Sequence, residues 1–445
     1  MKKKLFSLIT IILTVCMLLP SLSVGAATYK IDFETTAKAL ELINLDTGTI
    51  VYQKNADQKM YPASTTKIMT YIITVEKVKD LNSQVTVSKD VVDQLLGTGS
   101  SLSGIKEGET LTVLQLLNCM MVPSGNDAAL VLADYVGGGD VSQFVDMMNA
   151  KAKELDCKNT HFANPHGLQD ENHYTTADDL SKIARYAMTL PHFAEITSQL
   201  YYTIPATNKS PKARTINTTN GLLDPNSKYF YQYAKGIKTG STDEAGYCLV
   251  SDATKGSSSY LCVSLGAPEV DAKGNTVSPN GSFVDTKKLY QWAFSNLKLK
   301  TVINNTDKIG EVKLQYAWNK DTLSLTAEKS YSTILPNDVD ASSVLVTKHL
   351  PKSVSAPIKK GQPIGTATLS YAGQELTTIN LVAAESVERS ELLHSVDAAK
   401  SVFTSTWFLV IVALIVILLI IYIILAVVYN RRKRNLRRVK KYRRM

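Results

Sequence analysis

The stretch Tyr61-Pro62-Ala63-Ser64-Thr65-Thr66-Lys67 leads directly into an apolar run that includes Ile68, Met69, Ile72 and Ile73. Apolar residues at this spacing predict a buried helix that begins close to Ser64. Side chains three positions apart lie on one helix face, so the Lys67 amine and the Ser64 hydroxyl are expected to meet. The stretch therefore predicts a serine–lysine pair at the start of an interior helix.

Such a pair can carry out nucleophilic chemistry if the lysine accepts a proton. Serine is a poor nucleophile until a base removes its proton, and the lysine pKa of about 10.4 must fall towards neutrality for this role. Burial and a second cation lower that pKa, and Lys238 is the candidate cation. A backbone N–H at the helix start could stabilise an oxyanion. The alternative is a capping serine beside a surface lysine, because Ser-x-x-Lys occurs about two or three times by chance in such a chain.

Two further motifs follow in order, and each has a simpler explanation when taken alone. Ser124-Gly125-Asn126 falls in an expected loop between apolar helical stretches at 111–122 and 128–136, where Asn126 or Asp127 could merely cap a helix. Lys238-Thr239-Gly240 could be a β edge that carries a lysine, although Gly240 then requires an explanation such as the close approach of a ligand backbone. The three motifs together are typical of a serine acyl-transfer site that uses lysine.

The remaining pattern predicts an α+β catalytic domain over residues 28–297. Residues 39–45 and 50–53 flank Asp46-Thr47-Gly48, a hairpin signature, and residues 247–251 and 260–265 are β-rich. We expect the first and last strands to form one antiparallel sheet with helices packed against it.

A second, smaller domain is expected over residues 298–387. Short alternating segments at 312–317, 323–327, 366–371 and 375–379 predict an all-β fold, with Tyr371-Ala372-Gly373 as the turn between the last two. Residues 388–405 are polar and charged with helical periodicity, and we interpret them as a stalk that leads to a membrane.

Both ends of the chain are typical membrane signals. Three lysines precede an apolar run at 5–19, and Val24-Gly25-Ala26 resembles a cleavage site, so residues 1–27 are interpreted as a signal peptide, with an uncleaved anchor as the alternative. Residues 406–430 contain 23 consecutive uncharged residues from Trp407 to Tyr429 and are long enough to span a bilayer. The basic segment 431–445 should stay cytoplasmic, so everything before the span should face outward.

The net charge of +9 does not indicate a nucleic-acid partner. Lys2 to Lys4 and ten basic residues after Asn430 account for 13 of the 49 Lys and Arg, and the other 36 are outnumbered by 40 Asp and Glu. Four cysteines remain after the signal peptide, and their spacing neither requires a disulfide nor suggests zinc, so we treat them as small buried hydrophobes: Cys119, Cys157, Cys248 and Cys262.

When the residues that flank the three motifs are included, the sequence resembles the low-molecular-mass penicillin-binding proteins, the serine-type D-alanyl-D-alanine carboxypeptidases. The likeness runs from about Ala39 through the β domain and includes residues 61–67, 123–129, 161–168, 236–240 and 245–250. The resemblance implies the penicillin-recognising serine transferase (β-lactamase-like) fold, a location in the bacterial cell membrane with the catalytic domain on the cell-wall side, and covalent inhibition by β-lactams. It also implies no cofactor and no metal, so His161, His166 and His173 are interpreted as structural.

The resemblance further implies a role for each site residue. Ser64 would attack the carbonyl between two terminal D-alanines of a peptidoglycan stem peptide, with Lys67 as general base, and water would hydrolyse the acyl-enzyme. Ser124 would relay the proton to the leaving amine, while Asn126 would hold the substrate amide and orient Lys67. The Lys238-Thr239-Gly240 motif would receive the terminal carboxylate through Lys238 and Thr239. The N–H groups of Ser64 and Ser241 would form the oxyanion hole.

The chain departs from the family in two respects and leaves two rival functions open. Some relatives have an arginine after the third motif, but residues 266–298 contain none, so carboxylate binding would rest on Lys238 and Thr239. Many relatives end in an amphipathic helix, whereas this chain ends in a full span. A β-lactamase would share the motifs but require a deacylating glutamate loop, which we do not identify. A non-catalytic wall-binding scaffold would keep the fold but lose the catalytic side chains, whereas all the expected ones are present in this sequence.

Overall fold

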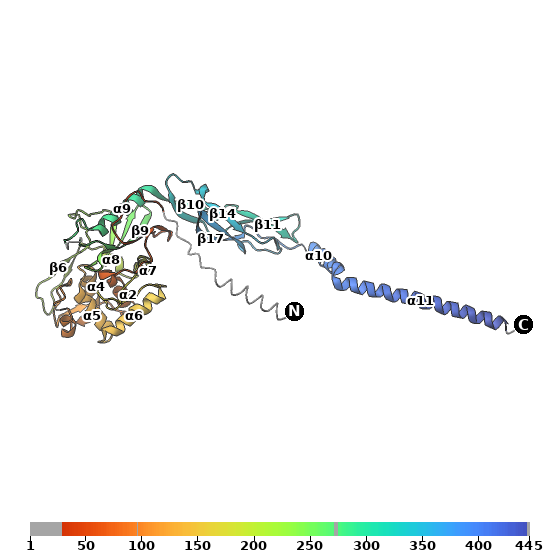
Figure 1. The fold of residues 1–445 in the computed structure, drawn as a ribbon, viewed down its shortest axis with the longest axis horizontal. Coiled ribbons are helices and arrows are strands. Elements are labelled where there is room, and N and C mark those ends of the chain that lie inside the picture. Colours follow the sequence, from red (N-terminus) through yellow and green to blue (C-terminus); the bar gives the residue numbers. More distant parts are fainter. Residues whose placement is uncertain (1–28, 96, 271–274, 443–445) are drawn as a thin grey trace. The chain divides into compact units, whose positions relative to one another are not determined.

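The computed structural model describes residues 29–95, 97–270 and 275–442, so the predicted signal peptide lies outside the described residues. The chain forms two compact units (Figure 1). Of the described residues, the first contains those up to Val302 with Tyr331–Leu345 and Leu369–Thr377, and the second contains Ile303–Ser330, Val346–Thr368 and those from Thr378 onward. The α+β class predicted from the sequence is confirmed.

A five-stranded antiparallel sheet organises the first unit. Its order is β2-β1-β9-β8-β7, so β1 pairs with both β2 and the late strand β9, and the first and last strands share one sheet, as predicted. The register between β1 and β9 places Ala39 opposite Leu265 and Asn44 opposite Tyr260. The strand bounds are β1 Ala39–Asn44, β2 Ile50–Lys54, β7 Ala234–Thr242, β8 Gly246–Lys255 and β9 Ser258–Ala267.

The two faces of this sheet bury two separate apolar cores. Leu40 and Leu42 on β1 belong to the core that includes helix α9 (Gly281–Asn296). Leu261 and Val263 on β9 belong to the larger core, which contains the remaining helices of the unit. Alternate residues of a strand point to opposite faces, so these strands are apolar on both sides.

Helix α2 (Lys67–Lys77) lies at the centre of the larger core. Its first eight residues are all buried, which fits a helix that is surrounded by others. The 3-10 turn η1 (Ala63–Thr66) precedes it, so the predicted helix is present but Ser64 lies in the tighter turn at its entry. The other helices of this unit are α3 Lys89–Asp93, α4 Val113–Met121, α5 Asn126–Val136, α6 Val141–Glu154, α7 Ala177–Ala187 and α8 Phe193–Thr197.

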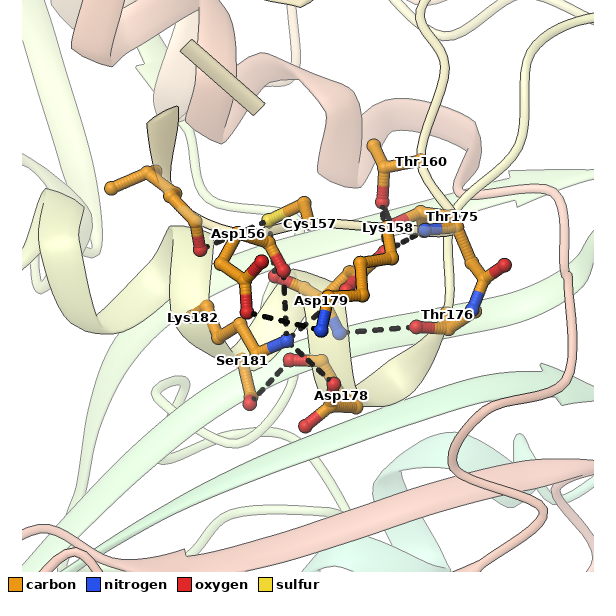
Figure 2. Close-up of polar contacts among 12 residues, drawn as sticks. Asp156, Cys157, Lys158, Thr160, Thr175, Thr176, Asp178, Asp179, Ser181 and Lys182 are labelled. Atoms are coloured by element: carbon orange, nitrogen blue, oxygen red, sulfur yellow. Dashed lines mark hydrogen bonds and ion pairs between the residues drawn. The ribbon is translucent and has the colours of Figure 1, made fainter. Parts of the chain in front are cut away.

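Asp179 near the start of α7 holds the loop that contains Thr160 (Figure 2). Its carboxylate accepts hydrogen bonds from the Asn159 N–H at 2.7 Å and the Thr160 hydroxyl at 2.8 Å. The side chain of Lys182 binds the carboxylate of Asp178 at 2.8 Å and that of Asp179 at 3.3 Å. Asp179 is buried, so this loop is fixed to the helix by charge-assisted hydrogen bonds.

Three small two-stranded sheets are also present. Strand β3 pairs with β4, β5 with β6, and β10 with β13. Their bounds are β3 Gln84–Thr86, β4 Thr110–Thr112, β5 Tyr201–Ile204, β6 Arg214–Asn217, β10 Leu297–Ile303 and β13 Tyr331–Pro336.

The predicted β-rich segment forms a six-stranded sheet in the order β14-β16-β17-β12-β11-β15. Strands β16 and β17 are joined at Ala372 and Gly373, whose φ values of 51° and 81° are typical of a tight hairpin turn. The element bounds are β11 Gly310–Gln315, β12 Thr322–Ala327, η2 Ala341–Ser343, β14 Leu345–His349, β15 Ser353–Ser355, β16 Pro363–Tyr371 and β17 Gln374–Ala383.

Two helices follow the β segment. The segment interpreted as a stalk contains helix α10 (Glu391–Thr404). Helix α11 (Thr406–Tyr442) includes a 28-residue stretch, Thr406–Lys433, that contains an 18-residue window with a mean hydropathy of 3.7 and no buried residue. By length and composition this stretch is a candidate membrane span.

Candidate active site

The turn η1 brings the Ser64 hydroxyl and the Lys67 amine together. Lys67 Nζ lies 2.8 Å from Ser64 Oγ, 2.6 Å from Asn126 Oδ1 and 2.7 Å from the carbonyl oxygen of His166. Lys67 is fully buried. An uncharged amine can donate its two N–H groups to the amide and carbonyl oxygens, which leaves its lone pair directed at the serine hydroxyl.

Burial lowers the pKa of Lys67 well below its ordinary value, and the positive charge of Lys238 lowers it further, while Asp127 acts in the opposite direction. Burial also lowers the pKa of Lys238 to about 7. Burial and a second lysine are the two conditions that the sequence argument required for a lysine base. The site therefore favours the uncharged form of the amine beside the hydroxyl.

Ser124 occupies the loop between α4 and α5. Its φ of 67° is in the left-handed region, where a residue other than glycine costs about 1 kcal/mol or more. Gly125 is needed there because a Cβ would lie 2.7 Å from the Cys119 carbonyl oxygen. Asn126 begins α5, so the backbone constraint of this loop and the start of the helix together fix both polar side chains.

Asp127 holds a second loop against the Ser124 motif. Its carboxylate accepts hydrogen bonds from the backbone N–H of Ser103 at 2.9 Å and of Gly104 at 3.0 Å. The N–H of Asn126 donates to the carbonyl oxygen of Ser101 at 2.9 Å. The sequence analysis considered Asp127 only as a helix cap, so it missed this bridging contact.

Strand β7 carries the third motif along the other side of the site. Gly240 approaches η1 so closely that a Cβ would lie 2.8 Å from the Ser64 nitrogen and 3.1 Å from the Pro62 carbonyl oxygen. The backbone of η1 therefore excludes a side chain at position 240. The sequence analysis had suggested that the backbone of a ligand would do so. Lys238 is buried, and its Nζ donates to the Thr239 carbonyl oxygen at 3.0 Å.

A pocket of about 230 Å³ opens above these groups. Five of the eight residues expected from the motifs line it, namely Ser64, Ser124, Thr239, Gly240 and Ser241. The other three, Lys67, Asn126 and Lys238, are buried. The lining also includes residues outside the three motifs, to which the sequence analysis gave no role in the site: Ser101, Thr219, Tyr247, Cys248, Asn280, Ser282 and Phe283.

The histidines expected to be structural differ in their surroundings. His166 and His173 are buried, and burial lowers the pKa of His166 to about 3 and that of His173 to about 4. His173 Nε2 lies 2.7 Å from Thr66 Oγ1, next to the nucleophile turn. His161 is exposed. Cys119, Cys157, Cys248 and Cys262 are all buried and unpaired.

The fold and the grouped serine and lysine side chains define a serine-type peptidase of the penicillin-binding class. The chain belongs to the D-alanyl-D-alanine carboxypeptidase family, whose model matches residues 25–269. A second model, described as the C-terminal domain of penicillin-binding protein 5, matches residues 297–389. The recognition made from the motifs is therefore confirmed.

Individual relatives support the same assignment. The D-alanyl-D-alanine carboxypeptidase DacF of Bacillus subtilis is 31% identical over 354 residues, which cover 80% of this chain and 86% of that protein. DacC of Escherichia coli is 31% identical over 364 residues, covering 79% and 84%. The crystal structure of penicillin-binding protein 5 from Haemophilus influenzae aligns with a TM-score of 0.65 at 30% identity, and it covers 81% of this chain and all of that one.

Proposed function

We propose that this enzyme removes the terminal D-alanine from peptidoglycan stem peptides through an acyl-enzyme on Ser64. The observation that carries the proposal is the buried Lys67 amine, 2.8 Å from the Ser64 hydroxyl and bound to two neutral oxygen acceptors. In the first step Lys67 takes the hydroxyl proton while Ser64 Oγ bonds to the carbonyl carbon between the two D-alanines. The N–H groups of Ser64 and Ser241 stabilise the resulting oxyanion.

The second half of the reaction releases both products. The C–N bond breaks as the leaving amine receives a proton through Ser124, and free D-alanine departs. Water then adds to the ester carbon, and loss of Ser64 Oγ yields the shortened peptide as a carboxylate. Lys238 and Thr239 bind the terminal carboxylate of the substrate, and Asn126 holds the substrate amide as well as Lys67.

Penicillins would acylate the same serine, because their strained amide presents a carbonyl and a nearby carboxylate to the same groups. We also propose that α11 anchors the enzyme in the bacterial cell membrane with the catalytic unit on the cell-wall side. The ten basic residues after Asn430 favour the cytoplasmic side for the tail.

The test is release of D-alanine by the detergent-solubilised full chain from a peptide ending in D-Ala-D-Ala. The proposal expects release by the parent enzyme and a loss of at least about 10³-fold in Ser64→Ala, with an unchanged melting temperature. Absence of release with an intact fold would favour the non-catalytic scaffold. Turnover of a penicillin adduct within seconds would favour a β-lactamase.

A further inference from the structure

A second pocket lies beside the catalytic groove and is not used by the reaction described above. It has a volume of about 460 Å³, twice that of the catalytic pocket. Its lining combines two cations, two anions and two aromatic rings: Lys38, Lys59, Glu171, Glu244, Tyr61 and Tyr174. Lys59 lies over the Tyr174 ring at 4.0 Å from the centroid.

The charged groups of this pocket are available to a ligand. Among the residues that the structure describes, the side chains of Lys38, Lys59, Glu171 and Glu244 form no ion pair. All four side chains are exposed. Because none of them is in an ion pair, a ligand could bind without breaking one. A pocket with both signs of charge favours a group that itself carries both an ammonium and a carboxylate.

The two pockets have different lining residues, but Cys248 of the catalytic pocket contacts Tyr61 of the second pocket. Tyr61 lies three residues before Ser64, and Glu244 lies three residues after Ser241, so each is within about 10 Å of an oxyanion-hole residue along the chain. The Cys248 thiol donates to the Tyr61 carbonyl oxygen at 3.6 Å, which fixes Tyr61 beside the hairpin that contains Glu244. The close approach of Gly240 to Ser64 keeps β7 against this wall.

The proposed function sets the direction of the bound peptide, and the present inference rests on it. The terminal carboxylate is at Lys238 and Thr239, and the reacting carbonyl is at Ser241. The peptide therefore runs from its carboxyl end along β7 towards the turn at Glu244. The residue that precedes the two D-alanines then lies next to the second pocket.

We propose that this pocket is a subsite for the side chain of that preceding residue. It selects a side chain that ends in both an ammonium and a carboxylate. Glu171 and Glu244 bind the ammonium, Lys38 and Lys59 bind the carboxylate, and Tyr61 and Tyr174 contact the methylene groups between them. Since these groups are exposed, each contributes a modest, salt-sensitive preference.

The test compares three peptides that differ only at the residue before D-Ala-D-Ala, which is meso-diaminopimelate, L-lysine or L-norleucine. The readout is kcat/KM for D-alanine release by the full chain at low and high salt. The expected order is diaminopimelate, lysine, norleucine, with about a fivefold step for each charge and a smaller range at high salt.

Two kinds of variant separate the two charges. Glu244→Gln should lower kcat/KM about fivefold for the diaminopimelate and lysine peptides and leave the norleucine peptide unchanged. Lys59→Gln should affect the diaminopimelate peptide alone. Glu107→Gln, an exposed acid outside this pocket, is the matched control and should alter none of the three.

The outcomes distinguish the subsite from the activity itself. Equal kcat/KM values for all three peptides, or a variant effect that is the same for every peptide, would overturn the subsite and leave the proposed function intact. Failure to cleave any of the three peptides would overturn the proposed function, and the subsite would fall with it.

Discussion

Lys67 Nζ lies 2.8 Å from Ser64 Oγ in a site that water does not reach from the lysine side, because Lys67 is fully buried. The amine is held in place by the Asn126 side chain and the His166 carbonyl oxygen. Both acceptors are neutral, so neither of them is a carboxylate that would hold the amine in its charged form by a direct hydrogen bond.

Replacement of Lys67 by methionine should remove the proposed base and keep an unbranched side chain of similar length. We expect Lys67→Met to lower the rate of Ser64 acylation by fluorescent penicillin by about 10³-fold, which is within the range for loss of a general base. Thermal unfolding of the same sample controls for folding. A variant that keeps more than a tenth of the parent rate would contradict a base role for Lys67.

The pH dependence of acylation should report the uncharged amine. The rate should rise as pH increases through the lowered pKa of Lys67 and reach a plateau above it. In Lys238→Gln the neighbouring positive charge is absent, so the pKa of Lys67 should rise and the profile should move to higher pH. The measurement is the acylation rate at saturating penicillin from pH 5 to 10, and a profile that stays in place or moves to lower pH would refute the coupling.

The close approach of β7 to η1 should be sensitive to a single methyl group. In Gly240→Ala the new Cβ would meet the Ser64 nitrogen at 2.8 Å, so the strand must shift and the two oxyanion-hole N–H groups separate. We expect acylation to fall about 10²-fold, which is typical for one lost donor. Gly310→Ala in β11 is a matched control on another strand and should leave the rate unchanged. Equal acylation rates for Gly240→Ala and Gly310→Ala would show that the contact between β7 and η1 does not affect acylation.

A buried carboxyl group outside the site should make stability depend on pH. Glu41 on β1 is 1% exposed, and neither carboxylate oxygen has a hydrogen-bond partner among the described residues. Burial raises its pKa to about 8, and the negative charge of Asp178 adds to the effect. Between pH 4.5 and 8 the Glu41 carboxyl group is therefore protonated in the folded state and ionised in the unfolded state.

The stabilisation linked to Glu41 should be present below pH 4.5 and disappear as pH rises through 8, by up to about 1.4 kcal/mol per pH unit. In Glu41→Gln this dependence should vanish, so the variant gains stability relative to the parent as pH rises. Denaturant unfolding at pH 5, 6.5 and 8 measures the difference. A constant difference at all three values would mean that Glu41 does not change its protonation on folding.

The helical part of the fold was accessible to sequence analysis because its signal is local. The apolar residues after Lys67 have the helical period, and the polar Ser124 motif interrupts two apolar helical runs. Strand β7 was considered only as a possible β edge at Lys238-Thr239-Gly240, because Ala234–Thr242 contains two glycines and two lysines and is fixed by pairing with β8. Its strand character depends on a partner that is formed elsewhere in the chain.

The same distinction applies to the candidate site. Residues of the three motifs were predicted because the chemistry restricts their types and spacing. Thr219, which lies 2.5 Å from Thr239 between the two hydroxyl oxygens, has no local signature. Asp127 was interpreted as a cap, and its contact with Ser103 becomes visible only once the loop 101–105 is in place. Contacts between distant segments required the structure.

The central claim is that Ser64 is the nucleophile and that Lys67 activates it. The most direct measurement is mass-spectrometric mapping of the penicilloyl group after brief exposure of the parent enzyme and of Lys67→Met to penicillin. The account predicts one modified peptide containing Ser64 in the parent and almost none in the variant at the same time point. A penicilloyl group on any other residue, or equal labelling of Ser64 in both proteins, would contradict it.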